Sequence, residues 1–129
     1  MTAQTYDVFI SYSSKDKEWV RGELLQRIEK AGLRGVVDFK LGDARESLRK
    51  LTKKIDFVLL DLWKELYIPC FDLFYPKLRP GALIIADNMI TPESSRKEAA
   101  AYQRHIRTMP GIQSLLLNVG FGLELTRYK

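Results

Sequence analysis

Two short groups of polar residues carry the side chains in this sequence that are best suited to chemistry. Asp61 and Lys64 follow one apolar run, and Asp87 and Asn88 follow another. If the two runs are neighbouring parallel strands, their carboxyl ends meet at one edge of the sheet, where oxygen ligands can converge. Hard cations such as Mg²⁺ and Ca²⁺ prefer oxygen ligands. The pattern therefore predicts a weak site for Mg²⁺ or Ca²⁺ formed by Asp61, Asp87 and Asn88.

The same residues also have a structural interpretation, and the sequence alone leaves both open. An aspartate at a strand end can cap the following turn, and Lys64 can be a solvated helix residue. Trp63 stands beside Asp61 and is placed to line a cleft. His105 has no Ser or Asp partner nearby in the sequence, so we expect no catalytic role for it.

Strand-like and helix-like patterns alternate along the chain. Runs rich in β-branched and aromatic residues predict strands, and apolar residues at helical spacing predict helices between them. The predicted strands are residues 6–12, 36–40, 55–60, 82–86, 114–119 and 123–128. The first helix is predicted to follow an N-cap at Ser13 or Ser14, and the others to begin at Ala44, near Pro69 and at Pro92. The alternation predicts an α/β fold with three layers, a doubly wound flavodoxin- or Rossmann-like sheet of order 2-1-3-4-6-5 whose last strand is antiparallel.

This sheet order also predicts where a ligand would bind. Doubly wound sheets bind ligands where the winding direction reverses, which here lies between strands one and three. The walls of the predicted cleft are the Ser13 and Ser14 loop and the segment from Asp61 to Trp63. The helix after Ser14 would point free backbone N–H groups at an anion such as phosphate.

The composition predicts one domain spanning residues 1–129. The chain has 129 residues, of which 46% are apolar, so it can bury a core, and no linker or repeat divides it. We find neither a signal peptide nor a membrane-spanning run, and expect a cytoplasmic protein with no membrane partner. Cys70 is the single cysteine, which excludes an internal disulfide partner and predicts a small buried residue.

The charge balance does not identify a partner. The chain has 21 Lys and Arg against 16 Asp and Glu, a net charge of +5, which could help to hold a polyanion. The densest basic group lies on the outer face of a short predicted helix and consists of Arg45, Arg49, Lys50, Lys53 and Lys54. Because no aromatic platform accompanies it, we interpret it as a solvated helix face and expect no nucleic-acid partner.

The first part of the chain resembles one protein family. The segment YDVFISYSSKD, residues 6–16, is similar to the first strand of Toll/interleukin-receptor (TIR) domains, and the helix over residues 19–31 matches the element that follows it there. The resemblance implies a protein-interaction module or an NAD-cleaving enzyme. Neither the signalling loop nor the catalytic glutamate of that family is recognisable after Gly32.

The remainder resembles another family over a longer stretch. The segments FKLGDARESL, FVLLDLWKELYIPCFD, YPKLRPGALIIADNMI and VGFGLELTRY run in the order seen in catechol- and caffeoyl-type O-methyltransferases. The resemblance implies that Asp61, Asp87 and Asn88 descend from the ligands of a divalent metal. It also implies that Lys64 descends from the lysine that helps to take the proton of the substrate hydroxyl.

The donor site of that second family is not recognisable. Such enzymes hold S-adenosylmethionine (SAM) with a glycine-rich turn after the first strand and an acidic residue after the second, and the TIR-like segment stands in their place. We therefore predict an engineered chimera with a crossover near residues 31–36, TIR-like over about 1–35 and methyltransferase-like over about 36–129. The chain is then a designed scaffold with no complete active site, no evolved function or partner, no enzymatic activity and no cofactor.

Two alternatives to a designed scaffold remain. The first is a remnant of a SAM-dependent O-methyltransferase that retains divalent-metal, SAM or nucleotide binding. In it Asp61, Asp87 and Asn88 are vestigial metal ligands and Lys64 is a vestigial catalytic candidate. The second is a TIR-type protein-interaction module.

Overall fold

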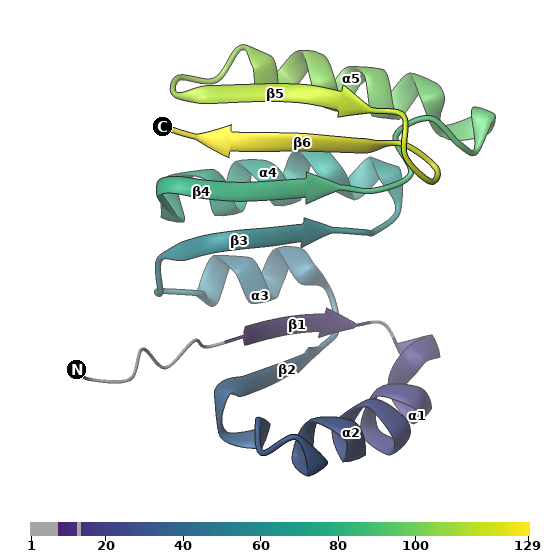
Figure 1. The fold of residues 1–129 in the computed structure, drawn as a ribbon, viewed down its shortest axis with the longest axis vertical. Helices are drawn as coiled ribbons and strands as arrows, with labels where there is room; N and C mark the ends of the chain where they lie inside the picture. The colour runs from purple at the N-terminus through teal and green to yellow at the C-terminus, as the bar shows by residue number, and fades with distance from the viewer. Residues whose placement is uncertain (1–7, 13) are drawn as a thin grey trace. The chain divides into compact units, whose positions relative to one another are not determined.

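The computed structural model of the chain describes residues 8–12 and 14–129. Strands and helices alternate along it, as the colour sequence of Figure 1 shows. The chain divides into two compact units, Met1–Leu51 and Thr52–Lys129, and each unit has its own sheet. The prediction of a single domain over residues 1–129 stays a prediction.

The first unit is a strand–helix–strand–helix arrangement. Strand β1 runs parallel to β2, with Val8 opposite Val37 and Tyr12 opposite Leu41. The elements are β1 (Val8–Tyr12), α1 (Lys17–Trp19), α2 (Leu25–Lys30), β2 (Val37–Leu41) and α3 (Ala44–Lys50). A 3-10 turn at Ser14–Asp16 precedes α1, and a π-helical turn at Val20–Leu24 joins α1 to α2, so the predicted long helix is formed by four successive segments.

Helix α3 begins at a side-chain cap. The Asp43 carboxylate accepts a hydrogen bond from the Arg45 backbone N–H at 2.9 Å and also pairs with the Arg45 guanidinium. The side-chain hydrogen bond from Arg45 lowers the Asp43 pKa to about 2. The helix buries Ala44 and Leu48 on its inner side, as its spacing predicts. Arg45 is therefore engaged within its own helix, in keeping with a solvated outer face.

The second unit contains a four-stranded mixed sheet of order β3-β4-β6-β5. Strand β4 runs parallel to β3, and β6 lies antiparallel between β4 and β5. The elements are β3 (Ile55–Leu60), α4 (Tyr67–Phe74), β4 (Leu78–Ala86), α5 (Arg96–Arg107), β5 (Ile112–Leu117) and β6 (Leu123–Tyr128), with 3-10 turns at Lys64–Leu66, Tyr75–Lys77 and Glu93–Ser95.

The predicted α/β class is confirmed at the level of strands, helices and a mixed four-stranded sheet. Strand pairing among the described residues gives two sheets, β1-β2 and β3-β4-β6-β5. Since no described pair joins β1 to β3, the predicted single sheet of order 2-1-3-4-6-5 is not confirmed. The antiparallel placement of the last strand is seen in its pairing with both neighbours.

Strand β5 lies at Ile112–Leu117, two residues earlier than the predicted 114–119. Two other predicted boundaries are wrong by four residues, for reasons of backbone geometry. Strand β4 begins at Leu78 rather than at residue 82, because an irregular register against β3 accommodates Pro80 and Gly81 inside the strand. The helix predicted to begin at Pro92 begins at Arg96. Pro92 is extended, with a ψ of 154°, and a 3-10 turn separates it from α5.

One face of the second sheet is covered by α4 and α5, which lie behind it in Figure 1. Its core is an aromatic cluster, in which the rings of Tyr67 and Phe71 both meet Tyr102 edge to face, at centroid distances of 5.5 and 6.1 Å. Phe74 adds a further edge contact to Phe71. Cys70 lies buried in α4, the helix that carries Tyr67 and Phe71, which confirms the prediction of a small buried residue at this position.

The opposite face of this sheet carries exposed apolar side chains. Phe57 lies opposite Leu83, and Leu83 lies opposite Arg127, so these three share one face. Phe57 and Leu59 are 57% and 62% exposed. The sheet therefore has one packed face and one open apolar face.

Glu124 is a fully buried acid on the packed face of β6. Its carboxylate accepts hydrogen bonds from Gln103 Nε2 and from the Arg107 guanidinium, both at 2.7 Å, and from the Ser114 hydroxyl. These donors come from α5 and β5, so the carboxylate joins helix to sheet. A buried charge is tolerated only when it is paired and hydrogen-bonded, as it is here.

We expect Glu124→Ala to lower the free energy of unfolding by about 2–3 kcal/mol, because the substitution leaves three donors without their acceptor. Urea denaturation followed by circular dichroism measures this change. Glu98→Ala, at an exposed position on α5, is the matched control and should change the free energy by less than about 0.5 kcal/mol. Equal effects in the two variants would show that the buried network contributes nothing specific.

Candidate functional site

The carboxyl ends of β3 and β4 meet at the edge of the second sheet. The two strands are paired in parallel up to Leu60 and Ala86, and the Asp87 backbone N–H continues the pairing by donating to Leu60 O at 3.0 Å. Asp61 and Asp87 therefore follow directly from neighbouring, hydrogen-bonded strand ends. This is the arrangement that the sequence pattern predicts for them.

Lys64 lies at the centre of the polar groups at this edge. Its Nζ donates to the Tyr67 hydroxyl at 2.7 Å and to the Asp87 backbone carbonyl at 2.8 Å. The Tyr67 hydroxyl donates to the same carbonyl at 2.9 Å. The Lys64 ammonium also lies 3.9 Å from the centre of the Tyr67 ring. Lys64 is thus held in a fixed position rather than extended into solvent.

The environment of Lys64 perturbs its protonation. Partial burial lowers the Lys64 pKa, while the charges of Asp61 and Asp87 act in the opposite direction. Burial likewise raises the pKa of the Tyr67 hydroxyl, and the Asp61 charge adds to that rise. Both carboxylates therefore lie close enough to act on the Lys64 and Tyr67 pair. A lysine whose pKa burial lowers at a strand edge is a candidate for proton transfer.

Asn88 has an unusual backbone conformation. Its φ is +56°, in the left-handed region that residues other than glycine seldom adopt and that Asn tolerates best. Its backbone N–H donates to Asp87 Oδ1 at 2.7 Å. The left-handed backbone at Asn88 turns the chain and keeps Asp87 and Asn88 at the edge of the sheet, where both residues are half-buried.

The segment after Asn88 is fastened to the turn between β5 and β6. Met89 N–H donates to Gly122 O at 3.0 Å, and Ile90 and Thr91 donate to Phe121 O at 2.9 and 3.0 Å. Gly122 has a φ of +91°, and a Cβ built on it would lie 2.5 Å from a side-chain carbon of Ile90 and 2.7 Å from its backbone nitrogen. Only glycine allows this close approach.

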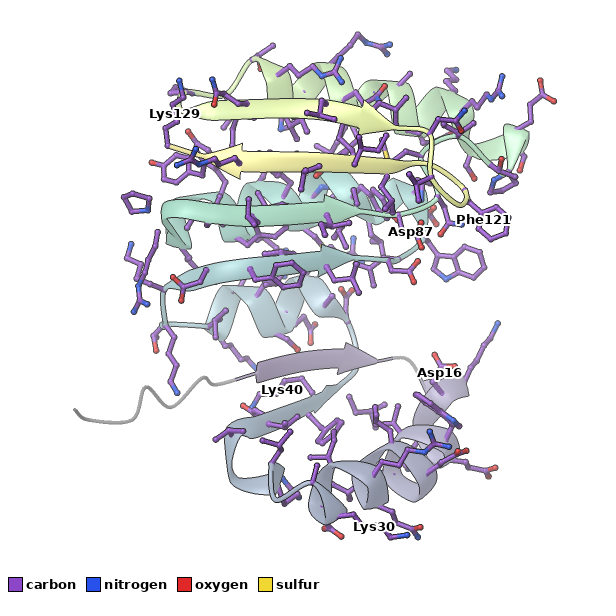
Figure 2. All side chains as sticks on the ribbon, viewed as in Figure 1. Asp16, Lys30, Lys40, Asp87, Phe121 and Lys129 are labelled. Atoms are coloured by element: carbon purple, nitrogen blue, oxygen red, sulfur yellow. The ribbon has the colours of Figure 1, made fainter. Side chains whose placement is uncertain are left out.

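Two exposed aromatic residues belong to the segments that form this edge. Trp63 follows Asp61 and is 72% exposed, and Phe121 is 59% exposed. Figure 2 shows Phe121 and Asp87 at the same end of the sheet. The sequence reasoning placed Trp63 here but missed Tyr67 and Phe121. The spacing of three residues between Lys64 and Tyr67 on one helical face was the available signal for Tyr67.

The remaining candidates are distributed differently. Ser13 lies outside the described residues, and Ser14 belongs to the first unit whereas Trp63 belongs to the second, so the cleft predicted between them stays a prediction. Among the described residues, hollows lie in the first unit at Val20, Leu25 and Phe39 and on the open sheet face of the second unit at Leu83, Leu115 and Leu125.

His105 has a partner that the sequence did not reveal. Its Nε2 lies 2.6 Å from Asp72 Oδ1 on the neighbouring helix α4, and its ring meets Phe71 edge to face. The pair joins two helices on the packed side of the sheet. It has no contact with the Lys64 group among the contacts of the described residues.

No group of three His, Cys, Asp or Glu side chains gathers as a metal site within residues 8–12 and 14–129. The predicted ligand set differs from such a group because it has two carboxylates, Asp61 and Asp87, and one amide, Asn88. The predicted metal site therefore depends on an amide oxygen as its third ligand, and it stays a prediction.

A family model described as a methyltransferase domain matches residues 3–89, which is more than half of the chain. The chain belongs to this methyltransferase family. The match begins before β1 and ends after Asn88, so it includes both the first strand–helix unit and the polar edge of the second sheet.

Curated relatives of this methyltransferase-family chain include catechol O-methyltransferases. The mouse protein is 35% identical over 74 residues, and the cattle protein is 38% identical over 72 residues. These alignments cover 52% and 50% of this chain but only 28% and 26% of the relatives. The chain thus spans about a quarter of the length of the curated relatives that it matches.

Solved methyltransferase structures share its fold. An O-methyltransferase from Bacillus cereus in complex with SAH has a TM-score of 0.80 at 21% identity and covers 95% of this chain and 63% of its own. The O-methyltransferase TomG from Streptomyces achromogenes in complex with SAM has a TM-score of 0.77 at 18% identity, covering 95% and 61%.

These findings correct the prediction of a TIR-like chimera. The family match crosses residues 31–36 without a break, and single natural structures cover 95% of the chain. No evidence supports a TIR domain or an engineered crossover. The error has a physical cause, because a β-branched strand followed by an amphipathic helix is the repeating unit of every α/β fold and does not identify a family by itself.

The functional predictions built on the chimera are wrong for the same reason. A designed scaffold without evolved function, the absence of enzymatic activity and the absence of a cofactor are contradicted by the methyltransferase match, by the catechol O-methyltransferase relatives and by neighbours solved with SAM or SAH. The alternative of an O-methyltransferase fits these findings better.

Within the part of the chain that the structure describes, no helix is both long enough and apolar enough to cross a lipid bilayer. The predicted cytoplasmic location and the predicted absence of nucleic-acid, membrane or other partners stay predictions.

We expect Gly122→Ala to disturb the polar edge more than Gly120→Ala does. Both glycines have positive φ values, +91° and +58°, but a Cβ at position 120 meets nothing within 4 Å. The alanine at position 122 should therefore cost about 1–3 kcal/mol of stability beyond the cost at position 120, because Ile90 must move.

Urea denaturation measures this difference, and the amide resonances of residues 87–91 report the displacement. A shift of those resonances of the same size in both variants would contradict the close packing of Gly122 against Ile90.

Proposed function

We propose that this chain carries the metal-binding and acceptor-binding side of an O-methyltransferase that methylates catechol-type hydroxyls with a divalent cation and SAM. The observation that carries the proposal is the position of Lys64. It is held by hydrogen bonds to Tyr67 and the Asp87 backbone, close enough to Asp61 and Asp87 for their charges to act on its pKa. The 35% and 38% identity to catechol O-methyltransferases over about half of the chain supports it.

The side chains at this edge fit a divalent cation by their chemistry. Asp61 and Asp87 offer carboxylate oxygens and Asn88 offers an amide oxygen, which are ligands suited to Mg²⁺. When bound, the cation supplies positive charge that lowers the pKa of an acceptor hydroxyl. Asp87 and Asn88 are consecutive residues, and the left-handed backbone of Asn88 fixes the direction of the chain at this point.

Lys64 is the proposed proton acceptor. Its Nζ is a half-buried group whose hydrogen bonds to Tyr67 and Asp87 hold it at the strand edge. Burial favours the neutral amine, the form that can take a proton from a hydroxyl. Tyr67 fixes the amine in place, since its own hydroxyl is anchored on the Asp87 carbonyl.

No glycine-rich turn of the kind that holds SAM follows β1 in the sequence. Nucleotide donors are held by glycine-rich turns through close backbone approach. The first glycine in the sequence is Gly22, far beyond the end of β1, and Gly111 and Gly122 are closely packed against the chain's own Tyr128 and Ile90. We therefore assign donor binding to no residue here and derive no step through it.

We expect the chain to bind Mg²⁺ and Asp87→Ala to weaken that binding by about tenfold or more, equivalent to about 1.4 kcal/mol, because a charged ligand is lost. Asn88→Gly should also weaken it, since glycine keeps the left-handed backbone without strain and removes only the amide. Isothermal titration calorimetry measures both affinities.

The matched control for these variants is Asp56→Ala. Asp56 is an exposed carboxylate in β3 paired with Arg79, far from the strand's carboxyl end. Equal Mg²⁺ affinity in wild type, Asp87→Ala and Asp56→Ala, or the absence of binding in wild type, would contradict the metal site.

A second test concerns the acceptor. We expect catechol to bind at least about tenfold more tightly with Mg²⁺ than with EDTA, because its adjacent hydroxyls can share one cation. Resorcinol has the same atoms with hydroxyls too far apart to do so and should show no Mg²⁺ dependence. Ligand-observed NMR titration measures the affinity of each diol with Mg²⁺ and with EDTA. An equal dependence on Mg²⁺ for catechol and resorcinol would count against a catechol-type acceptor.

A further inference from the structure

The turn between β5 and β6 presents one aromatic side chain beside the candidate site. Phe121 is 59% exposed and lies between Gly120 and Gly122, whose φ values are +58° and +91°. A single exposed aromatic residue is common on protein surfaces and carries no function by itself. Its attachment to the site is what distinguishes Phe121.

The backbone of Phe121 is fixed relative to the proposed metal ligands. Its carbonyl accepts hydrogen bonds from two successive backbone N–H groups, those of Ile90 and Thr91, and the next carbonyl accepts from Met89. These three donors directly follow Asn88. Ile90 also fills the space beside Gly122, which leaves the turn little freedom to move away from the ligands.

The Phe121 ring therefore lies at the end of the sheet where Asp87 and Asn88 are held, as Figure 2 shows for Phe121 and Asp87. Ligand sites combine a few fixed polar groups with apolar and aromatic walls. At this edge the polar groups come from the ends of β3 and β4, and an aromatic surface comes from the β5–β6 turn. An acceptor that places its oxygens at the carboxylates can rest an aryl ring on such a surface.

We infer that Phe121 is an acceptor-specificity residue whose ring contacts the aryl ring of the substrate. The inference rests on the proposed function, because it takes Asp61, Asp87 and Asn88 as the point where the acceptor oxygens bind. It adds that the preference for an aromatic acceptor is set by a residue from a distant turn of the chain.

The test uses two chelating probes that carry the same hydroxamate group, attached to a phenyl ring in one and to a methyl group in the other. Benzohydroxamate and acetohydroxamate present the same oxygen pair to Mg²⁺, so the ratio of their affinities for the Mg²⁺-loaded protein isolates the contact to the ring. We expect wild type to favour benzohydroxamate and Phe121→Ala to lower that ratio by about two- to tenfold, the range of one aromatic contact. Phe121→Tyr should retain the ratio.

The matched control is Val119→Ala. Val119 is 58% exposed in the same turn, and its carbonyl accepts from Gly122, a bond that the substitution keeps. Its affinity ratio should equal that of wild type. Circular dichroism and the urea midpoint of each variant verify that the fold is retained, which is expected because both side chains are exposed.

The outcomes separate the two proposals. Loss of the affinity ratio in Phe121→Ala with unchanged Mg²⁺ affinity supports the inference. An unchanged ratio in Phe121→Ala, or equal affinity of the two probes in wild type, overturns the inference about Phe121. If Mg²⁺ binding still depends on Asp87 in that case, the proposed function stands. Mg²⁺ binding that ignores Asp87 overturns the proposed function, and the inference with it.

Discussion

The candidate site depends on the parallel register between β3 and β4. Leu60 is paired with Ala86, and the next hydrogen bond, from the Asp87 N–H to Leu60 O, fixes the two strand ends against each other. A slip of one residue would turn every side chain on the strand to the other face. The convergence of Asp61 and Asp87 on Lys64 follows from this register rather than from local sequence.

The Asp87 carbonyl is the second fixed point. It accepts from both Lys64 Nζ and the Tyr67 hydroxyl, while the Tyr67 ring packs edge to face on Tyr102 in the core. Tyr67 thereby connects the buried aromatic cluster to the polar edge. The packing that stabilises α4 against α5 also holds the proposed proton acceptor in position, so stability and site geometry share the same residues.

The β5–β6 turn lies at the same edge of the sheet, next to the segment that follows β4. Its two carbonyls hold the segment after Asn88, and Gly122 permits the approach of Ile90. Glu124, only two residues later, is buried and bonded to α5 and β5. The turn therefore leads into β6, a strand that is hydrogen-bonded to the helix layer through Glu124. This connection holds the backbone of the exposed residue Phe121 in a fixed position.

The sequence by itself determined the elements and the polar residues. Apolar periodicity located β3 and β6 at their observed bounds, and strand-end position identified Asp61, Lys64, Asp87 and Asn88, because these signals are local. Family membership was misjudged for the first strand and helix, since that pattern is common to all α/β units. Only the tertiary structure brought Tyr67, Phe121 and the Asp72–His105 pair into view. Their contacts join positions some 20 or more residues apart, and such contacts exist only once strand register and helix packing have been fixed.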